Sequence, residues 1–403
     1  MSWGKNMDQN EKMRLRVKVG QVFSPAVPIT DRDLFAGRTT QLERLMEVVL
    51  QRGQHALIYG ERGVGKTSLA RVTQVLLGNS VLTSYYTCNS EDDFDTIWKG
   101  LLEDITFTAK APGFGFSTET QESVVSAAEL LAGDIGPRNV VRAAQLISRD
   151  LPLAVIIDEF DRPTSERTRT LMADTIKLLA DGGVPATIVL VGVADTVEEL
   201  IAKHESIQRP LIQVQMPRMT DGELRDIIQR GMASAGLEVD KAFVEEVATL
   251  SQGFPHFAHL LGQHGAMRAI NAGRRAVQHA DFSDALEDAL SQASQSVRER
   301  YHNATFSNRK TLYKEVLLAC AMADKDDMGS FGAPDVREQL RKITDTDYDI
   351  PAFAAHLKDF SSEDGPRGRI LQRIGTTRRF RYRFRDPLMP PYVVMKGRLD
   401  ALI

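Results

Sequence analysis

The feature that most constrains the fold is a glycine-rich segment between a short apolar run and a helical pattern. The segment reads Gly60-Glu-Arg-Gly-Val-Gly65-Lys66-Thr67 and fits the pattern G-x-x-x-x-G-K-[ST]. The apolar run His55–Tyr59 precedes it, and Thr67–Leu77 repeats apolar residues at helical spacing. A strand, a glycine-rich loop and a helix in this order predict the start of an α/β nucleotide-binding sheet.

Triphosphate binding requires these residue types at this spacing. Glycines let the backbone turn so that several N–H groups face phosphate oxygens, and the helix that follows adds its positive end. We expect Lys66 to reach the β- and γ-phosphates and the hydroxyl of Thr67 to bind Mg²⁺. A chance glycine-rich turn before a helix is the alternative. The residues of this loop expected to bind the nucleotide are Gly60, Glu61, Arg62, Gly63, Val64, Gly65, Lys66, Thr67 and Ser68.

A second motif, about ninety residues downstream, reads Leu153-Ala-Val-Ile-Ile-Asp158-Glu159. Its apolar run ends in two acids, and the carboxyl ends of parallel strands are where α/β sheets bind ligands. We expect Asp158 to hold Mg²⁺ through water and Glu159 to orient and deprotonate the attacking water. Acids after a strand are also common as solvated turn residues, but the pairing with the upstream loop favours the catalytic interpretation. Asp161 and Arg162 are expected to be supporting charges.

The rest of the pattern predicts an α/β fold. Apolar runs alternate with helical patterns as far as Leu211–Val214, which indicates a parallel P-loop sheet with helices on both faces. Helical patterns follow from Thr220, and Arg369–Arg385 alternates around Gly375 like a β-hairpin. The expected parts are a flexible extension over 1–21, a P-loop core over 22–217, a small helical lid domain over 218–298 and a winged-helix-like domain over 299–403.

The order of the motifs resembles the AAA+ ATPases. The motifs are GERGVGKTS, VIIDEFD, VGVAD, SIQRP and GFPHF, and they are most similar to the origin-recognition and initiator branch and its bacterial relatives. Those relatives include transposition ATPases and STAND-like signalling ATPases. The resemblance covers roughly residues 30 to 290 and extends weakly into the tail. It implies a protein that binds ATP with Mg²⁺, hydrolyses ATP to ADP and phosphate, and forms an ATP-dependent homo-oligomer.

The resemblance also implies further site residues. Asp195, in VGVAD, matches a position whose polar residue orients the attacking water, although the family uses Asn, Ser or Thr there. Asp195 could instead cap the helix that starts at Thr196. Arg209, in SIQRP, matches the arginine finger that reaches a neighbouring subunit's γ-phosphate, and a surface arginine is the alternative. His256, in GFPHF, stands where the family has an arginine that contacts the nucleotide, and a partly neutral histidine stabilises phosphate charge less.

A basic segment lies near the end of the chain. Residues 367–385 read RGRILQRIGTTRRFRYRFR, with no acid before Asp386. On a strand the arginines of Phe380–Arg385 would share one face and the aromatic residues the other. Such a stripe could contact the phosphates of duplex DNA, and the alternatives are a solvated face or pairing with acids of the same protein or its neighbours. The arginines expected at DNA are Arg378, Arg379, Arg381, Arg383 and Arg385.

Composition sets the remaining expectations. The 403 residues are 42% hydrophobic and 26% charged, as in ordinary globular proteins. The formal net charge of −4 does not by itself indicate a protein that binds nucleic acids. Cys88 and Cys320 lie far apart and in no metal-ligand spacing, which favours a reducing compartment. The polar N-terminus does not read as a signal peptide, and the apolar runs are too short to span a bilayer. We expect a cytoplasmic protein that does not contact membranes.

Two functions compete on this basis. In the first, ATP drives subunit association through Arg209 while the basic segment holds duplex DNA. In the second, the chain is a STAND-like regulatory switch with slow hydrolysis and a protein partner, which the histidine at position 256 favours. A small-molecule P-loop kinase fits poorly, because no arginine-rich lid follows the core.

Overall fold

The computed structural model describes most of the chain. The described residues are 7–25, 37–111, 121–131, 133–193, 207, 209–309, 311–326, 329–365, 367–375 and 380–403. They form two compact units: one comprises Arg38–Gly60 and Lys66–Met216, and the other comprises Met1–Gly37, Glu61–Gly65 and Pro217–Ile403. Among these residues, no helix has both the length and the apolar character that crossing a bilayer requires.

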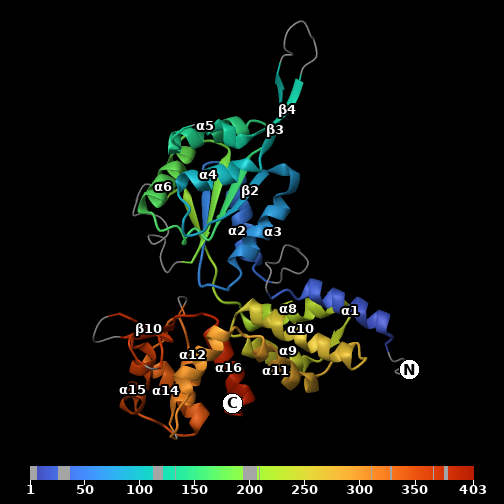
Figure 1. Ribbon diagram of the computed structural model, residues 1–403, viewed down its shortest axis with the longest axis vertical. Coiled ribbons are helices and arrows are strands. Elements are labelled where there is room, and N and C mark those ends of the chain that lie inside the picture. The colour runs from blue at the N-terminus through green and yellow to red at the C-terminus, as the bar shows by residue number, and fades with distance from the viewer. Residues whose placement is uncertain are drawn as a thin grey trace. The chain divides into compact units, whose positions relative to one another are not determined.

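A five-stranded parallel sheet forms the centre of the first unit (Figure 1). Its strands, in spatial order, are β2 (Leu82–Thr87), β5 (Leu153–Asp158), β6 (Ala186–Gly192), β1 (His55–Tyr59) and β7 (Leu211–Gln215). The central strands β5 and β6 are buried along their whole length, as expected of strands covered on both faces. The predicted parallel sheet with helices on both faces is therefore confirmed.

Helices cover both faces of this sheet. They are α2 (Thr39–Leu50), α3 (Lys66–Leu77), α4 (Phe94–Glu103), α5 (Pro137–Ile147) and α6 (Glu166–Asp181). Alternate strand residues such as Leu57, Val155 and Leu190 join one buried cluster with α4, α5 and α6. Because side chains alternate along a strand, the residues between them point to the opposite face, where α2 and α3 contact the sheet.

An antiparallel hairpin between α4 and α5 projects from the first unit (Figure 1). It consists of β3 (Thr106–Ala111) and β4 (Gln121–Ser126), two strands that were not predicted from the sequence. Both strands are short and mix β-branched with polar residues, so they lack the apolar run that marked the strands of the sheet.

The second unit begins with a helix where the sequence predicted a flexible extension over 1–21. Helix α1 (Gln9–Val22) is capped by Asp8 and contacts α8 (Asp221–Ala235) and α10 (Pro255–Asn271). Phe23 follows it and is completely buried. An added Cβ would lie 2.5 Å from the Phe23 ring at Gly231 and 2.7 Å from it at Gly262, so these two glycines make room for the ring. The prediction failed because this anchoring residue lies beyond the polar stretch.

Most other helices of the second unit follow the predicted pattern, and α16 near the end of the chain was not predicted. Thr220 and Glu223 form the predicted capping box at the start of α8, with each backbone N–H bonded to the other side chain. The predicted helices and hairpin of the C-terminal region are present, and β10 and β11 pair in antiparallel register. The remaining elements are α9 (Lys241–Leu250), α11 (Phe282–Ser291), α12 (Gln295–Thr305), α13 (Tyr313–Met322), α14 (Ala333–Thr344), α15 (Ile350–Ser361), β10 (Leu371–Ile374), β11 (Arg381–Phe384), α16 (Met389–Leu399) and the short strands β8 (Glu238–Val239) and β9 (Ala276–Val277).

Candidate nucleotide-binding site

The glycine-rich loop connects β1 to α3 through backbone conformations that only glycine adopts easily. Gly60 has a φ of 147°, and an added Cβ would lie 2.4 Å from the carbonyl oxygen of Met216. That contact is closer than any real Cβ makes, so Gly60 has no substitute at this position. Gly65 has a φ of 98°, which is equally unfavourable for other residues. The loop therefore turns as the phosphate-binding pattern requires.

Lys66 is the first residue of α3 and is buried. Its Nζ atom donates a hydrogen bond to the carbonyl oxygen of Gly60 over 3.0 Å, so the ammonium lies against the backbone of its own loop. Thr67 and Ser68 follow in the first helical turn, where backbone N–H groups have no partner within the helix. An ammonium beside a helix N-terminus provides a positive site for an anion.

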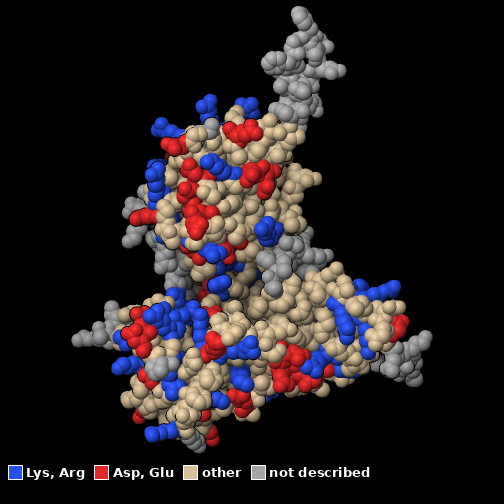
Figure 2. Space-filling model, in the orientation of Figure 1, with Lys and Arg blue, Asp and Glu red and all other residues tan. Residues whose placement is uncertain are grey.

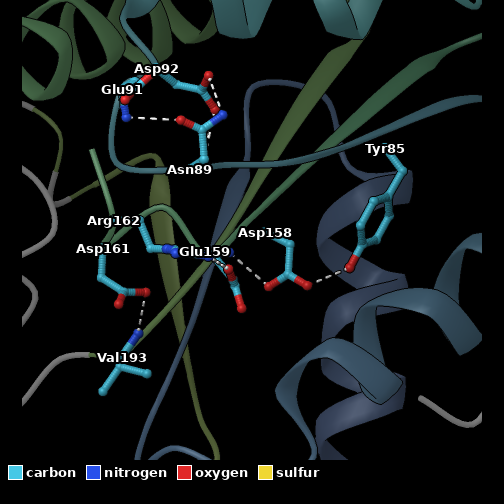
Figure 3. A network of polar contacts seen from close by, with 9 residues as sticks. All are labelled: Tyr85, Asn89, Glu91, Asp92, Asp158, Glu159, Asp161, Arg162 and Val193. Atoms are coloured by element: carbon cyan, nitrogen blue, oxygen red, sulfur yellow. Dashed lines mark hydrogen bonds and ion pairs between the residues drawn. The ribbon is translucent and has the colours of Figure 1, made fainter. Parts of the chain in front are cut away.

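Asp158 ends β5 and is buried. Its Oδ2 atom accepts a hydrogen bond from the Tyr85 hydroxyl over 2.7 Å, and its Oδ1 atom accepts one from the backbone N–H of Glu159 over 2.8 Å (Figure 3). Both carboxylate oxygens are therefore held in place. Burial, followed by the negative charge of Asp158, raises the pKa of Tyr85, so the phenol keeps its proton at neutral pH.

Tyr85 lies on β2, the strand beside β5, and no motif in the sequence marks it. Thr87 is paired with Asp158 across the two strands, and Tyr85 is two residues earlier on the same face. The guanidinium carbon of Arg71, on α3, lies 3.3 Å from the centre of the Tyr85 ring. Only the order of the strands brings β2 beside β5, and that order could not be obtained from the sequence.

Glu159 follows Asp158 with a φ of 54°, in the left-handed region. Such backbone is uncommon outside glycine and concentrates at functional sites. Its Oε2 atom accepts a hydrogen bond from Nη1 of Arg162 over 2.8 Å, with the two side chains 44% and 52% exposed. This hydrogen bond raises the pKa of Arg162. Arg162, expected to be a supporting charge, thus pairs directly with the expected catalytic base.

The turns around these acids are tied together by their own side chains. Asp161 accepts a hydrogen bond from the backbone N–H of Val193 over 2.9 Å, which joins the turn after β5 to the end of β6 (Figure 3). At the end of β2, Asp92 accepts hydrogen bonds from the backbone and side chain of Asn89, each over 2.8 Å. The acids and their supports therefore gather at the carboxyl ends of β2, β5 and β6. Asp195 lies outside the described residues.

Within the second unit, the side chain of Glu61 is paired with Arg218. The guanidinium donates to both carboxylate oxygens, over 2.7 Å and 3.1 Å, and lies 4.6 Å from the centre of the Phe254 ring. Phe254 belongs to the motif GFPHF, so this motif and the loop residues Glu61–Gly65 lie in the same unit. Arg218 could not be identified from the sequence, because nothing in the local sequence marks its distant partner.

His256 and Arg209 are placed as follows. Nδ1 of His256 lies 2.8 Å from the carbonyl oxygen of Pro25. A carbonyl only accepts hydrogen bonds, so Nδ1 carries the proton. Arg209 is exposed in the turn before β7.

The basic segment forms the predicted alternating strand, and its arginines are engaged by the same chain. Phe384 is buried, whereas Arg381 is exposed. Arg381 pairs with Asp326 over 3.0 Å, Arg383 donates to Gln372 over 3.2 Å, and Arg385 pairs with Glu363 over 3.4 Å. Figure 2 shows basic and acidic side chains mixed over the region of β10. Arg378 and Arg379 lie outside the described residues.

Comparisons with known proteins identify a matching family and similar solved structures. The sequence model of the family described as Novel STAND NTPase 1 matches residues 26–352. A Walker-type ATPase of Pyrococcus abyssi is similar in structure, with a TM-score of 0.51, 17% identity and coverage of 92% of this chain and 99% of its own. The ORC2 protein of Aeropyrum pernix, solved in ADPNP–ADP complexes, has a TM-score of 0.50 at 15% identity, covering 95% and 96%. No curated protein matches the chain.

Proposed function

The chain belongs to the novel STAND NTPase 1 family and has the fold of the AAA+ ATPases, and from that premise we propose that it is a nucleotide-dependent switch that binds ATP and hydrolyses it slowly to ADP and phosphate. The observation that carries the proposal is the anchored Asp158 at the end of β5, in the same unit as the buried Lys66 at the start of α3. Backbone N–H groups, an ammonium and a fixed carboxylate are what a triphosphate with a divalent cation needs.

The residues of the site fit Mg²⁺, which prefers oxygen ligands and keeps several waters. Thr67 would contribute its hydroxyl and Asp158 its carboxylate. A carboxylate has about four lone-pair sites, so the two hydrogen bonds that Asp158 accepts leave room for a cation or its water. When bound, Mg²⁺ neutralises phosphate charge. Lys66 and the backbone N–H groups of the first turn of α3 would bind the phosphate oxygens.

Slow hydrolysis is supported by the ion pair of the base and by the tautomer of His256. Glu159 would orient and deprotonate the attacking water, but its carboxylate must first leave Arg162. His256 donates from Nδ1 to Pro25, so its Nε2 atom could donate to a phosphate only with the ring protonated. An arginine at that position would be charged at all times. Both features suit a switch more than a rapid motor.

The same proposal includes assembly. Arg209 is exposed and would reach the γ-phosphate on a neighbouring copy in an ATP-dependent homo-oligomer. Asp195 would orient the attacking water. A protein partner and a cytoplasmic location are also proposed, and the two buried free cysteines are compatible with a reducing compartment.

Glu159→Gln tests the hydrolytic role. The variant should bind ATP as well as the wild type does, because the loop and Asp158 are unchanged, yet convert less than about a hundredth of the ATP per unit time. Single-turnover assays with radiolabelled ATP measure both quantities in one experiment. Equal ATP turnover in the variant and the wild type would show that Glu159 has no catalytic role.

Duplex DNA binding is the second candidate function, favoured by the exposed Arg381 on β11. Arg381 and Asp326 are each 44% exposed, and surface pairs of this kind contribute little stability, so DNA phosphates could replace Asp326. Fluorescence anisotropy with labelled duplex DNA should show affinity that falls steeply with salt, and Arg381→Ala should reduce the salt slope by about one. If the chain does not bind duplex DNA at low salt, that result would contradict this candidate function.

A further inference from the structure

Tyr85 connects the elements that carry the two proposed metal ligands. Thr67 lies in the first turn of α3, and Arg71 lies four residues later, so both occupy one face of the helix. The guanidinium carbon of Arg71 lies 3.3 Å from the centre of the Tyr85 ring. The Tyr85 hydroxyl in turn donates to Asp158 over 2.7 Å. A continuous series of contacts therefore runs from the helix that bears Thr67 to the carboxylate at the end of β5.

The Tyr85 hydrogen bond fixes one specific degree of freedom. An aspartate carboxylate at the end of a strand can rotate about its terminal bond, because that torsion is broad. The backbone N–H of Glu159 holds Oδ1 of Asp158 and the Tyr85 hydroxyl holds Oδ2, so together the two donors define the plane of the carboxylate. Hydrogen bonds to a charged acceptor are the stronger ones. Partners of metal ligands commonly set ligand orientation in this way.

We propose that Tyr85 is a positioning residue for the metal–nucleotide complex, a role that rests on the proposed function. Its hydroxyl orients the Asp158 carboxylate, and the stacked Arg71 orients the Tyr85 ring. The adjacent Tyr86 provides a matched comparison. It points to the opposite face of β2 and packs against the cluster shared with α4 to α6.

The experiment compares Tyr85→Phe with Tyr86→Phe in the full chain. Each variant keeps its ring and loses one hydroxyl. Electron paramagnetic resonance measures the affinity of Mn²⁺ for the protein–ATP complex, and a fluorescent ATP analogue measures nucleotide affinity in EDTA. Tyr85→Phe should weaken Mn²⁺ binding roughly tenfold and leave nucleotide affinity in EDTA unchanged. Tyr86→Phe should leave both affinities at the wild-type value.

A double variant sharpens the test. In an Asp158→Asn background, Tyr85→Phe should cause no further loss of Mn²⁺ affinity, because the carboxylate through which Tyr85 acts is gone. Mn²⁺ affinity at the wild-type value in Tyr85→Phe would overturn the proposal. Equal loss of Mn²⁺ affinity and metal-free nucleotide affinity would also overturn it, since a purely structural role predicts that result. If the wild-type chain binds no nucleotide, that result would instead contradict the proposed function as an ATP-binding switch.

Discussion

Glu159 is held by two constraints that act on its backbone and on its side chain. Its φ of 54° costs on the order of 1 kcal/mol or more outside glycine. The bond from its N–H to Oδ1 of Asp158 helps to keep this conformation. Its carboxylate is paired with Arg162. In the proposed mechanism, this ion pair would have to open before Glu159 could accept a proton from water.

Arg162→Ala should increase the rate of ATP turnover, because Glu159 no longer has to leave its partner. The pair is exposed and its contribution is small, so we expect roughly a two- to fivefold increase at saturating ATP. A coupled phosphate-release assay measures the rate. Arg167→Ala removes the same charge from an exposed position on α6 and is the control. Unchanged or slower turnover in Arg162→Ala would show that the pair does not restrain the base.

Residues that depend on their neighbours in sequence were predictable, and residues that depend on strand order were not. The loop through Lys66 and the acids Asp158 and Glu159 follow from residue spacing alone. Tyr85 acquires its role only because β2 lies beside β5 in the sheet. Arg218 likewise meets Glu61 across 157 residues of sequence. Long-range pairs of this kind leave no periodic signal in a single sequence.

At the scale of elements, periodicity predicted the strands of the sheet well and α1 poorly. The central strands are buried on both faces and therefore read as continuous apolar runs. Helix α1 buries only Leu15 and Val19, so its amphipathic pattern is weak. Helix α1 is anchored by Phe23, which follows its last residue and packs on Gly231 and Gly262.

Phe23→Ala should release α1 from α8 and α10. Truncating a fully buried phenylalanine costs about 3–5 kcal/mol, so amide exchange across Gln9–Val22 should accelerate about a hundredfold or more. Hydrogen–deuterium exchange with mass spectrometry measures this. Met13→Ala, which truncates an exposed side chain on the same helix, is the control and should leave exchange unchanged. Equal protection in Phe23→Ala and wild type would show that α1 is anchored elsewhere.

At the scale of the whole chain, the family to which the chain belongs and the observed fold both match what the order of the sequence motifs predicted. The first unit carries the parallel sheet, its covering helices α2 to α6 and the acids, and the second carries α1, the helices from α8 onward and the β10–β11 hairpin. The apolar strand runs give way to helical spacing near Thr220, so the sequence predicted that a mainly helical region follows the sheet. The division of the second unit into a helical domain and a winged-helix-like domain stays a prediction, as does the choice between a DNA-linked ATPase and a switch with a protein partner.

Equilibrium binding of a fluorescent ATP analogue to the full chain in the presence of Mg²⁺ tests the central claim most directly. The wild type should bind saturably, and Lys66→Ala should lose at least about tenfold in affinity, because in our proposal the buried ammonium binds the phosphates. Lys99→Ala, which removes an exposed lysine from α4, should bind like the wild type. Equal affinity in Lys66→Ala and wild type, or no binding by the wild type, would contradict a nucleotide site at this loop.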